Sequence, residues 1–414
     1  MRKYLAVAIA GAAATGIAAM PADRPSSDQG PRAATAVEPA GIPAGGYDPA
    51  QVPAPDDIPV ALLVDLSSGQ ALYSREADRR FVPASVTKVM TAYTAFKLVD
   101  EGTLRLNMPF LYTKELEDQW YNEGSNMFLL AGERPTIAQL LLGVTTVSGN
   151  DASVALAVAG VGSLDSWLAL MNANAQDLGM ADTHFGSPNG FPDGGQTYTT
   201  ARDLAALAEG MIERYPGLYR RFFGHRLLTW RDVTQANHDP VTGSVEGADG
   251  IKTGYTNEAG YTFVGSAERD GRRLVIVIAG APNAGVRNRA ARDMLEWGFD
   301  GFERRTLLTG GSIVGLAEVQ DGSASSVPLR LPADFEVAIP REGGGPLSSG
   351  GDWRVEIVYR GPIEAPIARG APIARMRFTM NGETVMETPL EADVNVARAN
   401  AAERVANAVS RWTR

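Results

Sequence analysis

The sequence predicts a mixed α/β fold of the α+β type, in which one antiparallel sheet packs beside a group of helices. Two strand patterns follow Ile58, helical periodicity dominates residues 85–211, and strand patterns return at 248–279. From residue 302, short strand patterns alternate with turns, which predicts a small all-β domain at 302–393. The chain of 414 residues is long enough for two domains.

Strand patterns open and close the first predicted domain, at 58–301. They occupy residues 60–65, 70–73, 248–255, 260–267 and 274–279. A turn at 67–69 joins the first two strands, and Asp270-Gly271, a tight-hairpin dipeptide, joins the last two. Because 274–278 is apolar at every position, we expect this strand at the centre of an antiparallel sheet of about five strands.

Helical patterns lie between and after these strands. They occupy residues 85–96, 136–171, 164–178, a stretch from Thr200 to Met211, and 287–299. Ser148-Gly149-Asn150 interrupts the second pattern, and a loop rich in glycine and proline at 186–199 precedes Thr200. We expect the helices between residues 85 and 211 to pack beside the sheet.

Both ends of the chain have their own patterns. Arg2 and Lys3 precede an apolar run that is shorter than a spanning helix needs, so residues 1–20 are typical of a signal peptide. Residues 21–57 are rich in proline and alanine and predict a disordered linker. Residues 394–414 predict a basic amphipathic helix, for which a membrane-surface contact and docking on its own domain are equal alternatives.

Composition excludes several classes of function. The formal net charge of −10 leaves no broadly basic surface, so we expect no nucleic-acid partner. The chain has no cysteine, which excludes disulfides, thiolate metal sites and a cysteine nucleophile. Its three histidines form no His-x-x-His or His-Glu-x-x-His pair, so we expect no zinc site.

A Ser-x-x-Lys tetrad, Ser85-Val86-Thr87-Lys88, opens the first helical pattern. At a spacing of i, i+3 the two side chains are neighbours, which brings an amine within hydrogen-bond reach of a hydroxyl. A serine needs such a base to act as a nucleophile. The tetrad alone also occurs by chance, as a serine near a helix start followed by a solvated lysine.

Two further motifs make the tetrad more specific. Ser148-Gly149-Asn150 lies at a break between helices, where a hydroxyl and an amide can project into a cleft. Lys252-Thr253-Gly254 lies in a strand, where lysine supplies a cation, threonine a hydroxyl, and glycine leaves room for a substrate backbone. Each motif alone is common in turns or strand ends. The three in this order are the combination found in penicillin-binding proteins and class A β-lactamases.

The chain resembles the low-molecular-mass penicillin-binding proteins that are serine-type D-alanyl-D-alanine carboxypeptidases. The resemblance extends from about Ala61 to Phe299, and Ala201-Arg202-Asp203-Leu204 and Ala259-Gly260-Tyr261 also match the family. It implies the penicillin-binding and β-lactamase-like transpeptidase fold, with a central antiparallel sheet and a helical subdomain. A β-domain and an amphipathic helix follow in that family. It also implies an exported, periplasmic enzyme without metal or cofactor, which acts on peptidoglycan stem peptides and is inhibited by β-lactams.

The resemblance assigns a role to each motif. Ser85 would attack the carbonyl between the two terminal D-alanines, and Lys88 would take its proton. Ser148 would relay a proton to the leaving amine, and Asn150 would orient Lys88. The substrate-binding residues would be Lys252, Thr253, Gly254 and Tyr255: the first two bind the terminal carboxylate, and the backbone N–H groups of Ser85 and Tyr255 form the oxyanion hole. Arg287 is a weaker carboxylate candidate, and we expect it to form a surface ion pair instead.

Two departures from relatives bear on the substrate. Several relatives have histidine where this chain has Tyr255, so substrate preference can differ. The loop 186–199 contains Asp193 but no glutamate, whereas class A β-lactamases use a glutamate there to activate the deacylating water. A β-lactamase is therefore a weaker alternative. A catalytically idle cell-wall scaffold is a second alternative, which the intact Ser85 and Lys88 disfavour.

Overall fold

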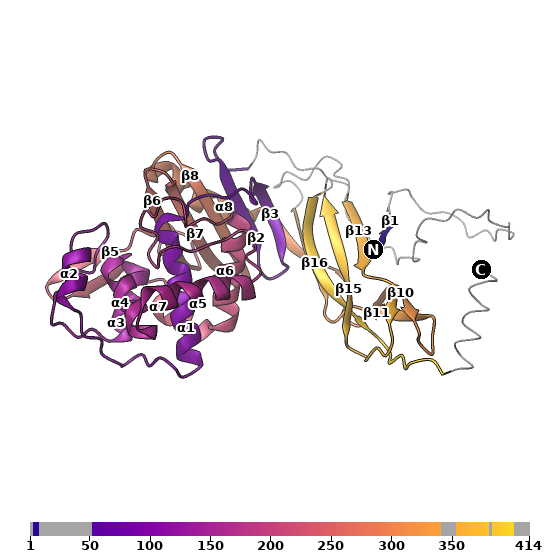
Figure 1. Ribbon diagram of the computed structural model, residues 1–414. Helices are drawn as coiled ribbons and strands as arrows, with labels where there is room; N and C mark the ends of the chain where they lie inside the picture. The colour runs from indigo at the N-terminus through magenta and orange to yellow at the C-terminus, as the bar shows by residue number, and fades with distance from the viewer. Residues whose placement is uncertain (1–2, 8–51, 341–352, 381–382, 401–414) are drawn as a thin grey trace. The chain divides into compact units, whose positions relative to one another are not determined.

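The computed structural model describes residues 3–7, 52–340, 353–380 and 383–400, shown in colour in Figure 1. It divides into two compact units. The helical unit contains Val52–Ser67 and Ala71–Asp300. The β-rich unit contains the described residues of Met1–Gln51, Ser68–Gln70 and Gly301–Arg414.

The helical unit is built on a five-stranded sheet, which confirms the predicted fold class. The strand order is β3 (Gln70–Arg75), β2 (Val60–Asp65), β8 (Arg272–Ala281), β7 (Gly260–Arg269), β6 (Ala248–Thr256). The central strand β8 pairs antiparallel with β2 and β7, as its continuous apolar run predicts. The strand β6, which carries Lys252-Thr253-Gly254, is an edge strand of this sheet.

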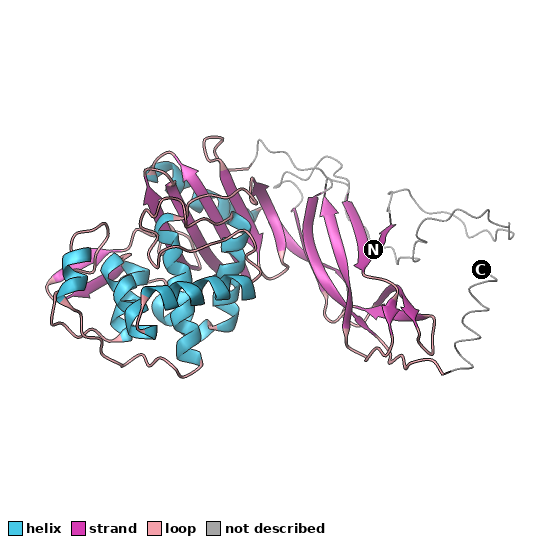
Figure 2. Cartoon of the chain, in the orientation of Figure 1, coloured by secondary structure: helices cyan, strands magenta, loops and turns pink. Residues whose placement is uncertain are grey.

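The helices of this unit pack against one another and against the sheet (Figure 2). They are α1 (Lys88–Asp100), α2 (Lys114–Trp120), α3 (Ile137–Thr146), α4 (Asn150–Val161), α5 (Leu164–Asp177), α6 (Ala201–Arg214), α7 (Pro216–Phe222) and α8 (Ala284–Asp300). Alternate residues of β8 point to opposite faces of the sheet. Val275 and Val277 belong to the large core that includes the helices before β6, whereas Leu274 lies against Gly298 of α8.

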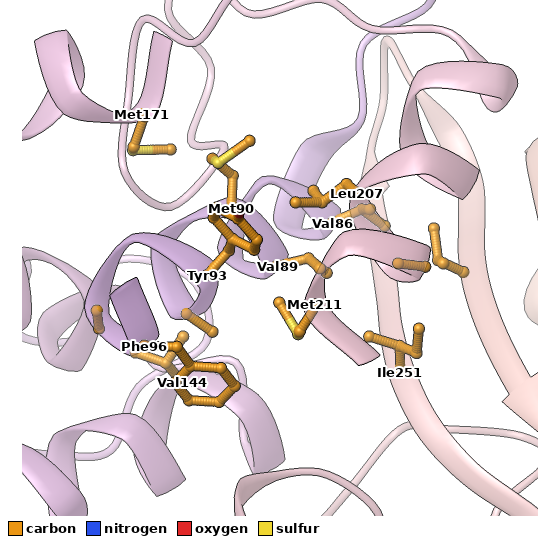
Figure 3. Packing of buried hydrophobic residues seen from close by; sticks show 14 of the residues in the cluster. Val86, Val89, Met90, Tyr93, Phe96, Val144, Met171, Leu207, Met211 and Ile251 are labelled. Carbon is orange, nitrogen blue, oxygen red and sulfur yellow. The ribbon is translucent and has the colours of Figure 1, made fainter. Parts of the chain in front are cut away.

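Helix α1 lies inside this core. Its residues from Lys88 to Phe96 are all buried, including its two inward threonines, so the helix has no solvent face along most of its length. Figure 3 shows Val89, Met90, Tyr93 and Phe96 among side chains from other helices and from β6. A helix packed on all sides holds its first residue, Lys88, in a fixed place.

The sequence analysis missed three short elements of this unit. They are α2, α7 and the hairpin of β4 (Leu227–Trp230) and β5 (Val233–Ala236). Helix α2 buries none of its residues, and exposed Lys114 pairs with Glu117 and Asp118. Helix α7 buries Tyr219 and Phe222, but elements as short as these carry too little apolar periodicity to be predicted.

The β-rich unit contains a seven-stranded sheet, which agrees with the predicted all-β character. Its order is β1 (Lys3–Val7), β13 (Trp353–Tyr359), β15 (Pro372–Met380), β16 (Glu383–Ala392), β11 (Ser326–Arg330), β10 (Ile313–Gln320), β14 (Ile363–Glu364). A second, two-stranded sheet pairs β12 (Phe335–Pro340) with β9 (Phe302–Leu308). Strands β9 and β16 were not predicted, because their charged residues break the apolar alternation.

Two predicted boundaries need correction. The predicted linker 21–57 ends too late, because residues 52–57 are described together with the helical unit and Arg75 Nη1 donates to Pro55 O at 2.7 Å. The predicted C-terminal helix begins too early, because Val396 and Arg398 form extended bridges with Ile367 and Gly322. Residues 401–414 of that helix, and most of the predicted signal peptide, lie outside the described residues.

Within the described residues, no individual helix has both the length and the apolar character needed to cross a membrane. One sharply bent pair, α4 with α5, meets those two criteria together.

Candidate active site

Ser85 lies in a single 3₁₀ turn, η2 (Ala84–Thr87), that leads directly into α1. Strand β6 passes close to this turn: a Cβ on Gly254 would lie 2.5 Å from Pro83 O and 3.2 Å from Val86 N. Only glycine at position 254 permits that approach. The edge strand and the serine are therefore held side by side, as the Lys-Thr-Gly motif predicts.

The Lys88 amine is the centre of a hydrogen-bond network. Its Nζ lies 2.9 Å from Ser85 Oγ, 2.8 Å from Asn150 Oδ1 and 2.7 Å from the backbone oxygen of Asn189. The last two oxygens can only accept, whereas a hydroxyl can also donate. Once neutral, the amine can keep donating to Asn150 and Asn189 while it accepts the proton of the Ser85 hydroxyl.

The surroundings of Lys88 favour that neutral form. The side chain is 1% exposed. Burial, followed by the charge of Lys252, lowers the pKa of Lys88 well below its usual value, and the Asp151 carboxylate opposes this shift. An amine with a strongly lowered pKa is available as a base near neutral pH.

Ser148 and Asn150 are positioned by the break between α3 and α4. Ser148 has a φ of 60°, and its buried Oγ has no hydrogen-bond partner among the described residues. Asn150 is the first residue of α4, and its Nδ2 donates to Glu123 O at 2.8 Å. A buried hydroxyl without a partner at a strained backbone position is available to a bound substrate.

The Lys252-Thr253-Gly254 segment of β6 is buried, and Tyr255 directly after it is exposed. Lys252 is 3% exposed, and its Nζ donates to Thr253 O at 3.0 Å. Burial, followed by the charge of Arg287, lowers the pKa of Lys252 to about 7. Tyr255 is 50% exposed and its ring lies 4.3 Å from the ring of Tyr261.

One pocket of about 680 Å³ brings most of the predicted site residues together. Its wall includes Ser85, Ser148, Asn150, Thr253, Gly254 and Tyr255. Lys88 and Lys252 are buried next to residues of this wall. The described residues contain no group of three or more His, Asp or Glu side chains that could hold a metal ion.

The pocket also contains residues that the sequence analysis did not assign. Phe191, from the loop 186–199, lines it and packs edge-on against Trp120 at 5.7 Å. His238 lines it as well. The backbone oxygen of Asn189 accepts a hydrogen bond from Lys88. A pattern of side chains in the sequence cannot predict a contact made by a backbone atom.

The prediction of a surface ion pair for Arg287 is wrong. Arg287 is 6% exposed, lines the pocket, and donates through Nε and Nη2 to Asn288 Oδ1 at 3.0 and 2.8 Å. Burial lowers the pKa of Arg287 to about 10, so its guanidinium remains charged at neutral pH. It is the permanent cation of the pocket.

Asp151 holds the wall of the pocket opposite β6. Its buried carboxylate accepts from Met127 N at 2.9 Å, Leu129 N at 3.0 Å and Ala152 N at 2.8 Å. Met127 and Leu129 belong to the segment that also presents Ser125 to the pocket. A single carboxylate thus fastens this segment to the start of α4.

Replacing Asp151 by asparagine should therefore destabilise the helical unit. The amide nitrogen cannot accept, which leaves a buried N–H without a partner and costs about 1–3 kcal/mol. Asp177→Asn is the control, since its carboxylate is 60% exposed and pairs only with Lys97. We expect thermal unfolding to occur at a clearly lower temperature in Asp151→Asn than in Asp177→Asn; equal melting temperatures would contradict this role.

Known proteins are similar to this chain in both sequence and fold. The family profile of D-alanyl-D-alanine carboxypeptidases matches residues 51–283, and that of the penicillin-binding protein 5 C-terminal domain matches residues 302–398. The chain is 30% identical to D-alanyl-D-alanine carboxypeptidase DacA of Escherichia coli (strain K12), over 80% of this chain and 81% of that one. It is 28% identical to DacF of Bacillus subtilis (strain 168), over 86% and 90%.

Solved structures give the same result. Penicillin binding protein 5 from Haemophilus influenzae superposes with a TM-score of 0.69 at 28% identity, covering 85% of this chain and 100% of that one. Penicillin-binding protein D2 from Listeria monocytogenes, in its ampicillin-bound form, gives a TM-score of 0.53 at 28% identity, covering 59% and 97%. With its Ser85–Lys88 pair in the matched region, this chain belongs to the family of D-alanyl-D-alanine carboxypeptidases.

Proposed function

We propose that this protein is a serine-type D-alanyl-D-alanine carboxypeptidase that removes the terminal D-alanine from peptidoglycan pentapeptides through a Ser85 acyl-enzyme. One observation carries the proposal. The Lys88 amine is buried, has a lowered pKa, and lies 2.9 Å from Ser85 Oγ while two acceptors hold its N–H groups. This is the arrangement that a lysine needs to take a proton from serine.

Acylation uses the groups of the pocket in order. Ser85 Oγ bonds to the carbonyl carbon of the penultimate D-alanine as its proton passes to Lys88. Backbone N–H groups of Ser85 and Tyr255 would stabilise the developing oxyanion. The C–N bond then breaks, and a proton relayed through Ser148 converts the leaving nitrogen to the amine of free D-alanine. Water later hydrolyses the ester and restores the Ser85 hydroxyl.

The cationic end of the pocket supports an exopeptidase. Lys252 and Thr253 would bind the terminal carboxylate of the substrate, and the buried guanidinium of Arg287 supports the same role. A peptide bond inside a longer chain has no carboxylate at this distance from the scissile carbonyl. The cations therefore select the last peptide bond of a stem peptide.

The loop 186–199 favours β-lactams as inhibitors over β-lactams as substrates. It contains no glutamate, and the carboxylate of its Asp193 accepts from Thr197 N and Thr197 Oγ1. A carboxylate engaged in this way is poorly placed to activate a deacylating water. Penicillin-binding protein D2 from Listeria monocytogenes, which is similar in fold, has been solved in ampicillin-bound and cefotaxime-bound forms.

Fluorescent penicillin and a D-alanine-ended pentapeptide test the function together. We expect the wild type to form a stable penicillin adduct and to release D-alanine, and Ser85→Ala to do neither while keeping its melting temperature. Equal D-alanine release by the wild type and Ser85→Ala would refute the proposal. Rapid turnover of a chromogenic cephalosporin would favour the β-lactamase alternative, and an unlabelled, inactive wild type would favour the scaffold.

The surrounding segments extend the proposal to the cell. We propose a signal peptide at 1–20, a linker that ends near Val52, and export to the periplasm, supported by the apolar run after Lys3. A membrane-surface contact through residues 401–414, which carry three arginines, would make the protein peripheral on the inner membrane. Unchanged partitioning in fractionated cells after truncation at Asn400 would exclude this contact.

A further inference from the structure

We propose that His238 is a substrate-binding residue at the cationic end of the pocket, where its protonation adds a third positive charge for the terminal carboxylate. The inference rests on the proposed carboxypeptidase function and deepens it. It makes the affinity for carboxylate-ended peptides depend on pH through a residue outside all three sequence motifs.

The backbone on both sides of His238 is held firmly. Asn237 Nδ2 donates to His225 O at 2.9 Å, and Asn237 Oδ1 accepts from Asp239 N at 3.0 Å. Asp239 Oδ1 accepts from Val241 N at 2.9 Å. In contrast, His238 keeps part of its surface open to solvent and lines the pocket, and its ring makes no hydrogen bond to another described residue. A tightly held turn thus presents an unpaired ring to the substrate site.

The charged groups around this ring are mainly positive. Lys252 of β6 and Arg287 of α8 act on His238 electrostatically, and the side chains of Tyr255 and Tyr261 share the pocket wall. The neighbouring carboxylate, Asp239, is already engaged by its own turn, where it accepts from Val241 N and from Thr242.

The wall of the pocket contains no Asp or Glu, although the chain carries 48 acidic residues. No acidic side chain of the wall balances the positive charges at this end of the pocket, so an anionic ligand would be favoured there. Because the proposed reaction supplies a peptide carboxylate at this place, that carboxylate is the anion we assign to it.

Titration of His238 links this site to pH. Partial burial and the charges of Lys252 and Arg287 lower the pKa of His238, so the ring is mostly neutral in the empty pocket at neutral pH. A bound carboxylate stabilises the imidazolium and raises this pKa. Binding then takes up a proton, and by linkage the affinity for the carboxylate increases as the pH falls through this range.

Lys252 responds at a different pH. Its pKa of about 7 leaves it mostly protonated at pH values well below neutrality. Proton uptake that accompanies carboxylate binding below neutral pH is therefore due to His238. A loss of affinity for the carboxylate above neutral pH is due to deprotonation of Lys252. Arg287 stays charged throughout.

NMR titration of the histidine rings can test the proposal directly, since the chain has only three histidines. The full chain with Ser85→Ala would be titrated from pH 5 to 8 alone, with an N-acylated Lys-D-Ala-D-Ala peptide, and with the same peptide amidated at its C-terminus. We expect the free acid, but not the amide, to raise the pKa of His238. We also expect the free acid to bind about three- to ten-fold more tightly at pH 5 than at neutral pH, a range that lies below the deprotonation of Lys252.

Variants complete the test. His238→Gln should remove this gain below neutrality, and His238→Arg should bind the acid tightly without any further gain below neutrality, since its charge does not titrate there. The control is His225→Gln, since the His225 ring contacts Arg221 O and does not line the pocket. An unchanged pKa of His238 with the free acid, or a His238→Gln protein that keeps the gain, would overturn the proposal. Release of D-alanine by the wild type is measured in parallel, and its absence would refute the proposed function instead.

Discussion

Replacing Lys88 by methionine should lower the rate of Ser85 acylation by fluorescent penicillin by about 10²–10⁴-fold, the usual contribution of a general base. Methionine fills a similar volume in the buried start of α1 but cannot accept the serine proton. Lys97→Met is the matched control, because Lys97 lies on the same helix and contacts Asn174 and Asp177 outside the pocket. Acylation of Lys88→Met at a rate within ten-fold of the wild type would show that another group takes the proton.

The pH profile of the wild type gives a second check on Lys88. The amine must be neutral to act as a base, and its pKa lies well below the usual lysine value. The acylation rate should therefore be high near neutrality and decline as the pH falls through the pKa of Lys88. A profile that rises only above the normal lysine range would mean that the amine is charged in the free enzyme.

Replacing Gly190 by alanine should disrupt the site almost as strongly, although glycine has no side chain to contribute. Gly190 has a φ of +72°, and a Cβ there would overlap the Ala84 carbonyl and approach Thr87 Oγ1 to 2.8 Å. The loop would have to move away from η2, and the neighbouring Asn189 O would leave Lys88. Because small displacements of catalytic groups are costly, we expect acylation to fall about 10²-fold.

Gly194→Ala is the control for this substitution. Gly194 belongs to the same loop and has the same φ of +72°, but nothing lies within 4 Å of the position of a Cβ. Both variants bear the cost of a left-handed alanine, about 1–2 kcal/mol, whereas only Gly190→Ala bears the overlap. Equal acylation rates in the two variants would show that contact between the loop and η2 does not position Lys88.

The sequence predicted the parts of the structure that regular patterns encode. The continuous apolar run of β8 predicted its central place, and the fixed spacing of Ser85 and Lys88 predicted their contact, which is 2.9 Å. These features depend on residues near one another in the chain, or on burial that leaves a period in the sequence.

The remaining parts depend on contacts between distant segments. Asn189 acts through a backbone oxygen, and Arg287 is buried by a fold that brings the start of α8 next to β6. His238 follows a short exposed hairpin without periodicity. No local pattern reports such placements. The predicted helix 394–414 was wrong over its first residues, because bridges at Val396 and Arg398 hold them extended.

The place of β6 at the edge of its sheet has a consequence for stereochemistry. An extended peptide that lies along this open edge would hydrogen-bond to the protein through its main chain, as one more strand. In that arrangement, inverting the configuration of a residue exchanges the places of its side chain and its Cα hydrogen, so the side chain leaves the face of the sheet on which the strand alternation would put it. For such a strand-like peptide, D- and L-alanine would point their methyl groups in different directions from the same main-chain position. An inhibitor with L-configured residues would then have to direct its substituents to other parts of the pocket than a D-configured one.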